Sequence, residues 1–263
     1  MKKYLGILSW FLLLLGVFAL LGFVKQKQTA QACQAIQIRI DRSNGNFFVE
    51  EEDISSMLYH DVDTVLGRPL DAINTEALEH KIDNHPSIAN SEVFKTINGK
   101  LIIEVEQRTP IVRIFSNSGD TYYIDSTGNF MPTSKKYTAR VLIANGNIRQ
   151  DFVHLAHLNV NHLKDSSANA SILKQLFNFA QFIRKEPFWR AQIEQLYVNK
   201  DSELELIPRV GNHRIVMGDD SMLEQKFEKL KIFYLKGLPK TGWNEYSVIN
   251  LKYANQIVCT KQN

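Results

Sequence analysis

The chain has 263 residues, a formal net charge of +3 at pH 7, and hydrophobic residues at 44% of its positions. Its first 24 residues contain two lysines and no acidic residue, so residues 25–263 carry 29 basic and 28 acidic side chains. This balance argues against a nucleic-acid-binding protein, which is expected to carry a basic stripe. The polar part is long enough for one large or two small domains.

The first predicted element is an apolar run from Leu5 to Val24 that contains no charged residue. A helix of that length is about 30 Å long and matches the hydrocarbon core of a bilayer. We therefore predict a cytoplasmic tail (1–4), a single transmembrane helix (5–24) and extracytoplasmic domains. Lysines flank both ends of the run and nearly balance, so the charge rule alone does not decide the orientation. The short tail favours translocation of the large C-terminal part.

A cleaved signal peptide is the alternative reading of this run, because Ala30–Ala32 has the A-x-A form of a cleavage site. However, the apolar core of a signal peptide usually spans about 7–15 residues, and this run is longer. Lys25 and Lys27 also separate the run from the candidate cut. A lipoprotein site at Cys33 would lie too far beyond the run. An uncleaved anchor is the preferred interpretation.

After a polar stem (25–35), residues 36–108 predict a strand, two helices and a hairpin. Ile36–Ile40 alternates apolar and polar residues, as a half-buried strand does. Glu50–Tyr59 has helical spacing, and Asn74 can cap a second helix that presents Ala77, Leu78 and Ile82 on one face. Asn98-Gly99 is a strong hairpin signal between two extended segments, Ile88–Ile97 and Lys100–Gln107.

This order of elements resembles a POTRA domain, and three later motifs narrow the resemblance to the FtsQ/DivIB division-protein family. Gln107–Val112 resembles the junction that follows the family's POTRA domain, Tyr122–Gly128 resembles its second-domain hairpin, and Val248–Tyr253 resembles its terminal strand. Asn250 stands where the family usually has Asp, and Lys252 where it often has Arg. The resemblance covers nearly the whole chain.

Residues 109–263 predict a second, strand-rich domain, so the expected fold class is α+β. The predicted strands are Ile111–Phe115, Thr121–Ile124, Val141–Ile143, Ile193–Val198, Leu204–Ile207, Arg214–Met217, Tyr246–Leu251 and Gln256–Thr260. The predicted helices are Phe152–Leu163, Ile172–Arg184 and Met222–Leu235.

The sequence contains no motif that indicates catalysis, a cofactor or a metal. Neither a nucleophile elbow nor a phosphate-binding loop occurs. His154 and His157 could share one face of a predicted helix, but His162 lies about 140° further around it, so these residues are expected to be surface histidines. Because catalytic triads assemble from distant residues, the missing motifs do not by themselves exclude an enzyme.

The resemblance implies binding sites for proteins. In the FtsQ/DivIB family the terminal region binds the FtsB–FtsL membrane pair, and the second POTRA strand is linked to recruitment by earlier division proteins. The corresponding candidate partner-binding residues are Leu251, Lys252, Tyr253, Ile257 and Val258, and the candidate recruitment residues are Ile88, Val93 and Lys95. Leu251, Tyr253, Ile257 and Val258, and also Val93, could instead belong to the core.

The expected function is therefore a non-enzymatic scaffold in the bacterial cytoplasmic (inner) membrane at the division septum. It would link early division proteins to septal peptidoglycan synthesis by binding other membrane proteins, and would bind no nucleic acid or small-molecule substrate. One alternative is a POTRA-containing translocation or outer-membrane assembly component, which would need repeated POTRA units or a β-barrel. Another is a membrane-tethered hydrolase that uses the His154 and His157 face.

Overall fold

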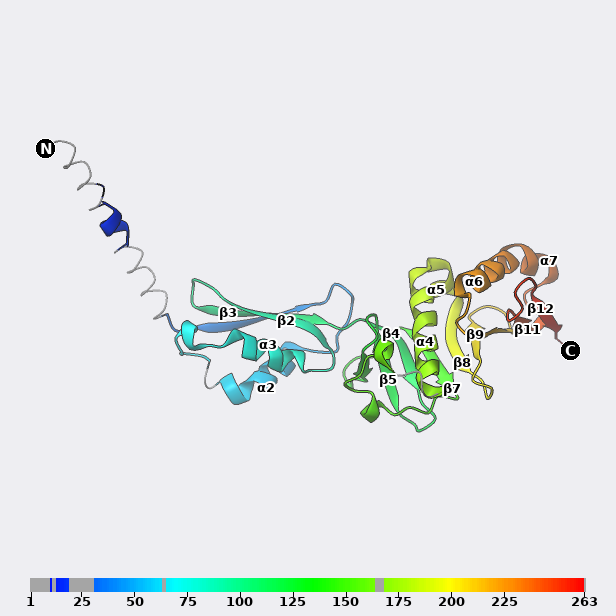
Figure 1. The fold of residues 1–263 in the computed structure, drawn as a ribbon, viewed down its shortest axis with the longest axis horizontal. Helices are drawn as coiled ribbons and strands as arrows, with labels where there is room; N and C mark the ends of the chain where they lie inside the picture. Colours follow the sequence, from blue (N-terminus) through cyan, green and yellow to red (C-terminus); the bar gives the residue numbers. More distant parts are fainter. Residues whose placement is uncertain (1–9, 11–12, 19–30, 63–64, 164–167, 263) are drawn as a thin grey trace. The chain divides into compact units, whose positions relative to one another are not determined.

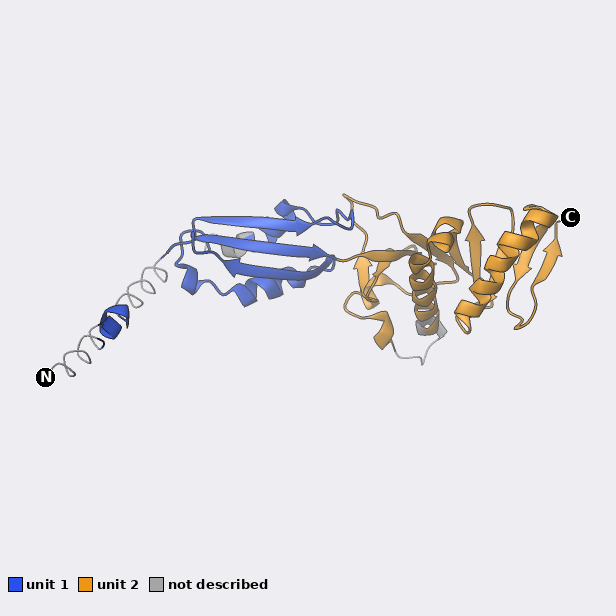
Figure 2. Cartoon of the chain, turned by 90° about the horizontal axis from the view of Figure 1, so that it is seen from above, with its two compact units in different colours: residues 1–107 blue, residues 108–263 orange. Residues whose placement is uncertain are grey.

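The computed structural model describes residue 10 and residues 13–18, 31–62, 65–163 and 168–262. The predicted cytoplasmic tail, most of the predicted transmembrane helix and most of the stem lie outside these residues. Within the described part of the chain, no helix is long and apolar enough to cross a membrane. The chain divides into two compact units, Met1–Gln107 (unit 1) and Arg108–Asn263 (unit 2) (Figure 2).

Unit 1 is a three-stranded sheet with its helices on one face (Figure 1). The strand order is β1-β3-β2, with β3 parallel to β1 and antiparallel to β2. The predicted order of strand, two helices and hairpin is confirmed. Its elements are β1 (Ala35–Asp41), α2 (Glu51–Val62), a 3-10 turn (Leu70–Ala72), α3 (Thr75–Asp83), β2 (Ile88–Lys95) and β3 (Lys100–Gln107).

Helix α3 begins where the sequence predicts a cap. The side-chain oxygen of Asn74 accepts a hydrogen bond from the Ala77 backbone N–H at 3.1 Å, which satisfies one of the free donors of the first turn. Leu78 and Ile82 are buried, as the spacing predicts, but Ala77 is exposed. The predicted apolar face is therefore narrower than the sequence indicates.

Gln107 holds the end of β3 in unit 1. It is 3% exposed, and its side-chain oxygen accepts hydrogen bonds from the backbone N–H groups of Phe48 (2.8 Å) and Val49 (3.1 Å). Its amide nitrogen donates to the carbonyl oxygens of Asn46 (2.9 Å) and Asp41 (3.2 Å). Gln107, the first residue of the junction motif, thus satisfies one backbone group at the end of β1 and three in the segment between β1 and α2.

Unit 2 is built on a nine-stranded sheet with the order β12-β11-β10-β9-β8-β7-β4-β5-β6. Parallel pairs join β4 to β7, β7 to β8 and β10 to β11, and the other neighbours are antiparallel. The predicted α+β class is confirmed. The strands are β4 (Pro110–Phe115), β5 (Thr121–Asp125), β6 (Phe130–Pro132), β7 (Leu142–Gly146), β8 (Ile193–Val198), β9 (Leu204–Pro208), β10 (Arg214–Gly218), β11 (Tyr246–Asn250) and β12 (Val258–Lys261).

The helices of unit 2 pack aromatic side chains into its core. Trp189, Phe227 and Tyr234 are almost fully buried, and the Trp189 ring lies 5.1 Å from that of Phe227 and 5.6 Å from that of Tyr234, measured between centroids. Aromatic pairs at such distances contribute beyond the area that they bury. The helices are α4 (Ala168–Lys185), α5 (Pro187–Gln192), α6 (Leu223–Ile232), the π-helical turn η4 (Phe233–Gly237) and α7 (Leu238–Thr241).

The predicted helix Phe152–Leu163 is wrong. This segment forms two short 3-10 turns, η2 (Phe152–His154) and η3 (Val160–His162). The Val160 N–H bonds the Gly128 carbonyl at 2.8 Å, and the Asn159 amide donates to Asn129 at 3.0 Å. These tertiary bonds replace the helical ones, and asparagine side chains compete with helix formation in any case.

The other predicted elements of unit 2 differ from the structure mainly at their ends. The structure adds a short strand, β6, and a short helix, α5, that the sequence analysis did not predict. The predicted helix Met222–Leu235 is α6 followed by η4, whose π-helical turn no residue pattern indicated. The predicted final strand, Gln256–Thr260, begins two residues later as β12.

A buried histidine makes the stability of unit 2 depend on pH. His213 is 3% exposed, with Nε2 2.8 Å from the Tyr234 hydroxyl. Burial lowers its pKa below the ordinary value of 6.5, and the Trp243 backbone only partly opposes this effect. The unfolded chain then binds a proton near pH 6.5 while the folded chain does not. Stability should therefore be complete above that pH and decline as the pH falls below it.

The test is urea unfolding at about pH 7.5 and about pH 5.5, monitored by tryptophan fluorescence. We expect the His213→Gln variant to lose less stability between the two pH values than the wild type. His154→Gln is the matched control, because His154 is exposed. An equal pH dependence in the wild type and His213→Gln would exclude His213 as the source.

Candidate partner-binding surfaces

The nine-stranded sheet ends at β12, which pairs antiparallel with β11. The other edge of β12 faces away from the sheet and presents backbone groups that a further strand could pair with. Three of its four residues are exposed, including Val258 at 41%. The candidate residues Leu251–Tyr253, Ile257 and Val258 lie in β12 and in the loop that joins it to β11.

Leu251 does not belong to this surface. It is fully buried in the core of unit 2, and its backbone N–H donates to the Val216 carbonyl at 2.9 Å. The apolar pattern could not separate a core residue from a contact residue at this position. The neighbouring Asn250 accepts a hydrogen bond from the Lys252 N–H through its side-chain oxygen at 3.0 Å. An amide therefore makes the turn contact at the position where the family usually has a carboxylate.

Lys252 is exposed but already paired. Its ammonium lies 2.5 Å from Oε1 of Glu203, and this hydrogen bond is the main cause of a raised Lys252 pKa. Its aliphatic carbons cover Gly218, where an added Cβ would lie 3.1 Å from Cγ of Lys252. A partner carboxylate that binds Lys252 would therefore compete with Glu203.

Tyr253 is 48% exposed on the loop between β11 and β12. The Lys229 ammonium of α6 donates to the carbonyl oxygens of Tyr253 (2.7 Å) and Ala254 (2.9 Å), which ties the loop to the helix. The backbone that carries Tyr253 is thus held in place while its ring is available for contact. A half-exposed tyrosine on a fixed backbone has the properties of an interface anchor.

Ile257 lines a hollow of about 410 Å³ between this loop and the helical segment of α6 and η4. Ile232 and Phe233 form its apolar side, and Lys229 and Lys236 stand among its lining residues. Ile257 is partly buried against the core. A partner side chain that enters this hollow would meet apolar surface next to positive charge.

The proposed recruitment strand of unit 1 is less accessible than the sequence analysis expects. Ile88 is fully buried and Val93 is 5% exposed, so both are core residues, whereas Lys95 is exposed. β2 is an edge strand, but the Val93 N–H donates to Oε1 of Glu79 on α3 at 2.7 Å. This side chain occupies the middle of the strand edge.

The structure adds exposed apolar residues that the sequence analysis did not select. Phe94 is 40% exposed next to Lys95. Ile232, which lines the hollow, is 52% exposed, and Leu235 on η4 is 59% exposed. Residues of β2 alternate between the two faces of the sheet, so the alternation alone could have identified Phe94 as exposed on the face opposite the buried Val93. Ile232 and Leu235 alternate along the chain with the buried Leu230 and Tyr234. The sequence therefore does not distinguish them from core residues, and the three-dimensional packing does.

Clusters of side chains for metal binding or catalysis were sought in the residues that the structure describes. Among them, no three His, Cys, Asp or Glu side chains are arranged to hold a metal ion. His154 and His162 lie at the ends of two separate 3-10 turns, so the helical face assumed for the histidines does not exist. Lys226 is buried, and its ammonium donates to the backbone carbonyl (2.9 Å) and carboxylate (3.0 Å) of Asp219. Hydrogen bonds from Ser221 and Lys226 lower the pKa of Asp219 to about 2.

Comparison with known protein families assigns both units. The family described as FtsQ/DivIB, C-terminal related matches residues 109–260. The chain belongs to the FtsQ/DivIB family. The POTRA-like domain matches residues 31–106, in agreement with the helix and strand order of unit 1. No curated protein gave a match.

Members of the FtsQ/DivIB family are non-catalytic proteins of cell division, and membership indicates that other division proteins are its partners. The family assignment also suggests a place at the membrane of the division septum.

Proposed function

We propose that this FtsQ/DivIB protein is a non-enzymatic scaffold that binds an FtsB–FtsL-like pair of membrane proteins through the β12 edge. The observation that carries the proposal is the outer edge of β12, which pairs with no strand among the described residues, beside the half-exposed Tyr253. A partner strand would add to β12, Tyr253 and Val258 would contact it, and the hollow at Ile257 would take an apolar side chain. Lys252 is the neighbour of Tyr253 in the chain, so an acidic residue of the same partner could bind its ammonium in place of Glu203.

The apolar run 5–24 supports an anchor with the N-terminus in the cytoplasm and both units outside it. Confinement to one membrane raises the effective concentration of the scaffold near other anchored proteins. Weak contacts at β12 are then sufficient for assembly. Through these contacts the protein would link early division proteins to septal peptidoglycan synthesis.

Recruitment by earlier division proteins is proposed for the accessible end of β2. Of the three residues selected from the sequence, Lys95 remains a candidate, and Phe94 joins it. The buried residues of β2 would act only by holding this end in place.

The test of the β12 site is capture of an FtsB–FtsL-like pair by the full chain and by a Tyr253→Glu variant. A charge introduced at the centre of an interface should cost about 2 kcal/mol or more, which is about a 30-fold loss of affinity. Tyr197→Glu is the matched control, because Tyr197 is 37% exposed on β8 in the same sheet. Circular dichroism establishes that both variants are folded.

Equal capture by wild type and Tyr253→Glu would retain the scaffold and reject the site. If the wild type captures no division protein, the scaffold itself is rejected. A role in translocation or outer-membrane assembly would then be the reading to test.

A further inference from the structure

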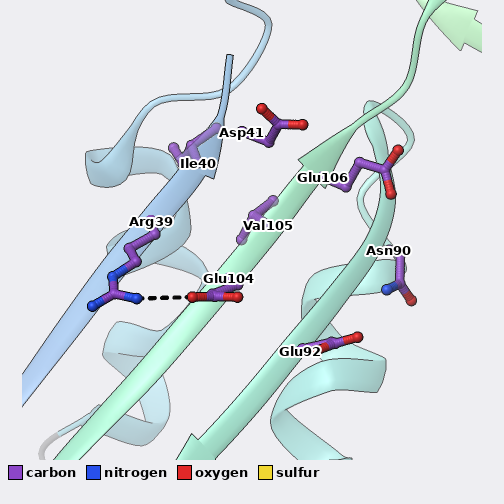
Figure 3. Close-up of a pocket in the computed structure, with 8 residues that line it drawn as sticks. All are labelled: Arg39, Ile40, Asp41, Asn90, Glu92, Glu104, Val105 and Glu106. Atoms are coloured by element: carbon purple, nitrogen blue, oxygen red, sulfur yellow. Dashed lines mark hydrogen bonds and ion pairs between the residues drawn. The ribbon is translucent and has the colours of Figure 1, made fainter. Parts of the chain in front are cut away.

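The open face of the unit 1 sheet is strongly acidic. α2 and α3 cover the face that carries the buried residues of β3, and the opposite face holds a hollow of about 360 Å³ (Figure 3). Four carboxylates and one guanidinium give the lining of this hollow a charge of −3, opposite in sign to the +3 of the whole chain. The polar residues are Arg39, Asp41, Asn90, Glu92, Glu104 and Glu106.

The strand register places like charges opposite each other on this face. Glu92 is the cross-strand neighbour of Glu104, and Asp41 is that of Glu106. Like charges in this position destabilise a sheet. Arg39 neutralises one carboxylate by pairing with Glu104 at 3.0 Å (Figure 3), while Glu92 and Glu106 have no ion-pair partner among the described residues. Folding therefore leaves repulsion that a positively charged partner would relieve.

Hydrogen bonds favour the charged form of Asp41 on this face. The backbone N–H and the hydroxyl of Ser43 donate to the Asp41 carboxylate at 2.8 and 3.0 Å, and these bonds lower the Asp41 pKa. Carboxylates two residues apart along one strand, such as Glu104 and Glu106, are separated by about 7 Å. The charge is thus spread over the face, and no group of three carboxylates among the described residues can hold one metal ion.

An apolar area continues the face along the strands. Phe94 is the cross-strand neighbour of Ile102, two residues beyond Glu92 and Glu104, and its ring is 40% exposed. Ile97, in the turn after β2, is 76% exposed. A ligand that covers the acidic area would therefore meet apolar surface at one end. A polypeptide segment offers both kinds of group, whereas a metal ion offers only charge.

We propose that the open face of the unit 1 sheet binds a cationic segment of a partner protein. Lysine or arginine side chains of the partner contact Glu92, Glu106 and Asp41, and an apolar residue packs on Phe94. This surface is distinct from the β12 edge and does not depend on the function proposed for that edge, but it shares Phe94 with the recruitment site proposed for β2 and deepens that proposal. Complementary charge gives the encounter speed and selectivity, and it makes the binding sensitive to salt.

The test uses the full chain in a mild detergent and a fluorescent peptide in which lysine alternates with serine, with one tryptophan at its end. The Glu92→Gln, Glu106→Gln double variant should bind this peptide about tenfold more weakly, because two surface ion pairs are lost. Its melting temperature should equal or exceed that of the wild type, since the like-charge repulsion is reduced. Hydrogen exchange should show protection by the peptide in β1, β2 and β3.

The matched control is the Glu51→Gln, Glu52→Gln variant, which removes the same charge from exposed positions on α2. Wild-type affinity in this control supports the proposal. Equal weakening in both double variants would overturn it, because binding would then follow net charge alone. Protection confined to other elements would also overturn it, as would a dimer of the chain that requires Glu92 and Glu106, since a second copy would then be the occupant.

Discussion

Replacing Asp125 with alanine should lower the free energy of unfolding of unit 2 by about 3 kcal/mol, because it removes a buried carboxylate that pairs with Arg108 and accepts several hydrogen bonds from the turn that follows β5. The Asp125 side chain is 3% exposed, and its Oδ2 lies 3.0 Å from Nη1 of Arg108. Its Oδ1 accepts hydrogen bonds from the Thr127 N–H and hydroxyl and from the Asn129 N–H, each at 2.8 Å. The substitution therefore removes the centre of the β5–β6 turn.

The measurement is chemical unfolding of the wild type, Asp125→Ala and Asp125→Asn, with tryptophan fluorescence as the signal. Asparagine keeps the shape and part of the hydrogen bonding but loses the charge, so its effect should be intermediate. Asp220→Ala serves as a control, because this carboxylate is only partly buried and accepts a single hydrogen bond in the structure, from Asn178. If Asp125→Ala unfolds within about 1 kcal/mol of the wild type, the turn does not depend on this carboxylate.

Gly146→Ala should be at least as damaging. Gly146 ends β7 with φ at +101°, and an added Cβ would lie 2.2 Å from the carbonyl oxygen and 2.8 Å from the nitrogen of Val198 on β8. Both neighbours are backbone atoms of a paired strand, so neither can move without breaking the β7–β8 ladder. Strain at a positive φ costs about 1–3 kcal/mol, and the steric overlap should bring the total to about 4 kcal/mol or more.

Gly119→Ala separates the two contributions. Gly119 has a similar φ of +92°, but nothing lies within 4 Å of an added Cβ. It should show the backbone strain alone, with a loss near the lower end of that range. Comparable unfolding midpoints for Gly146→Ala and Gly119→Ala would show that β7 and β8 can move apart at Gly146 without a loss of stability.

The sequence predicts best where one local interaction decides the structure. The Asn74 cap, the Asn98-Gly99 turn and the alternation of β3 each depend on residues close together in the chain, and each is found in the structure. The junction motif is also explained by packing. Gln107 satisfies backbone groups of unit 1, and Arg108 pairs with Asp125 in unit 2.

Prediction from the sequence fails where contacts with distant parts of the chain determine the conformation or burial of a residue. The segment Phe152–Leu163 has a helical pattern, but its backbone bonds the turn at Gly128, which lies far away in the sequence. The burial of Leu251, Ile88 and Val93 also depends on which neighbours cover them, and an apolar side chain alone does not indicate its neighbours. For this reason the selected sites contain three core residues among eight.

The length of β12 limits how firmly a partner can be held there. The strand has four residues, and in an antiparallel pair only alternate residues turn their N–H and C=O groups toward one neighbour. An added strand would thus gain about four backbone hydrogen bonds, each with a net worth of about 0.5–1.5 kcal/mol. Ordering the incoming segment consumes much of this energy. A complex at this edge would exchange readily, so subunits could enter and leave while a septum closes.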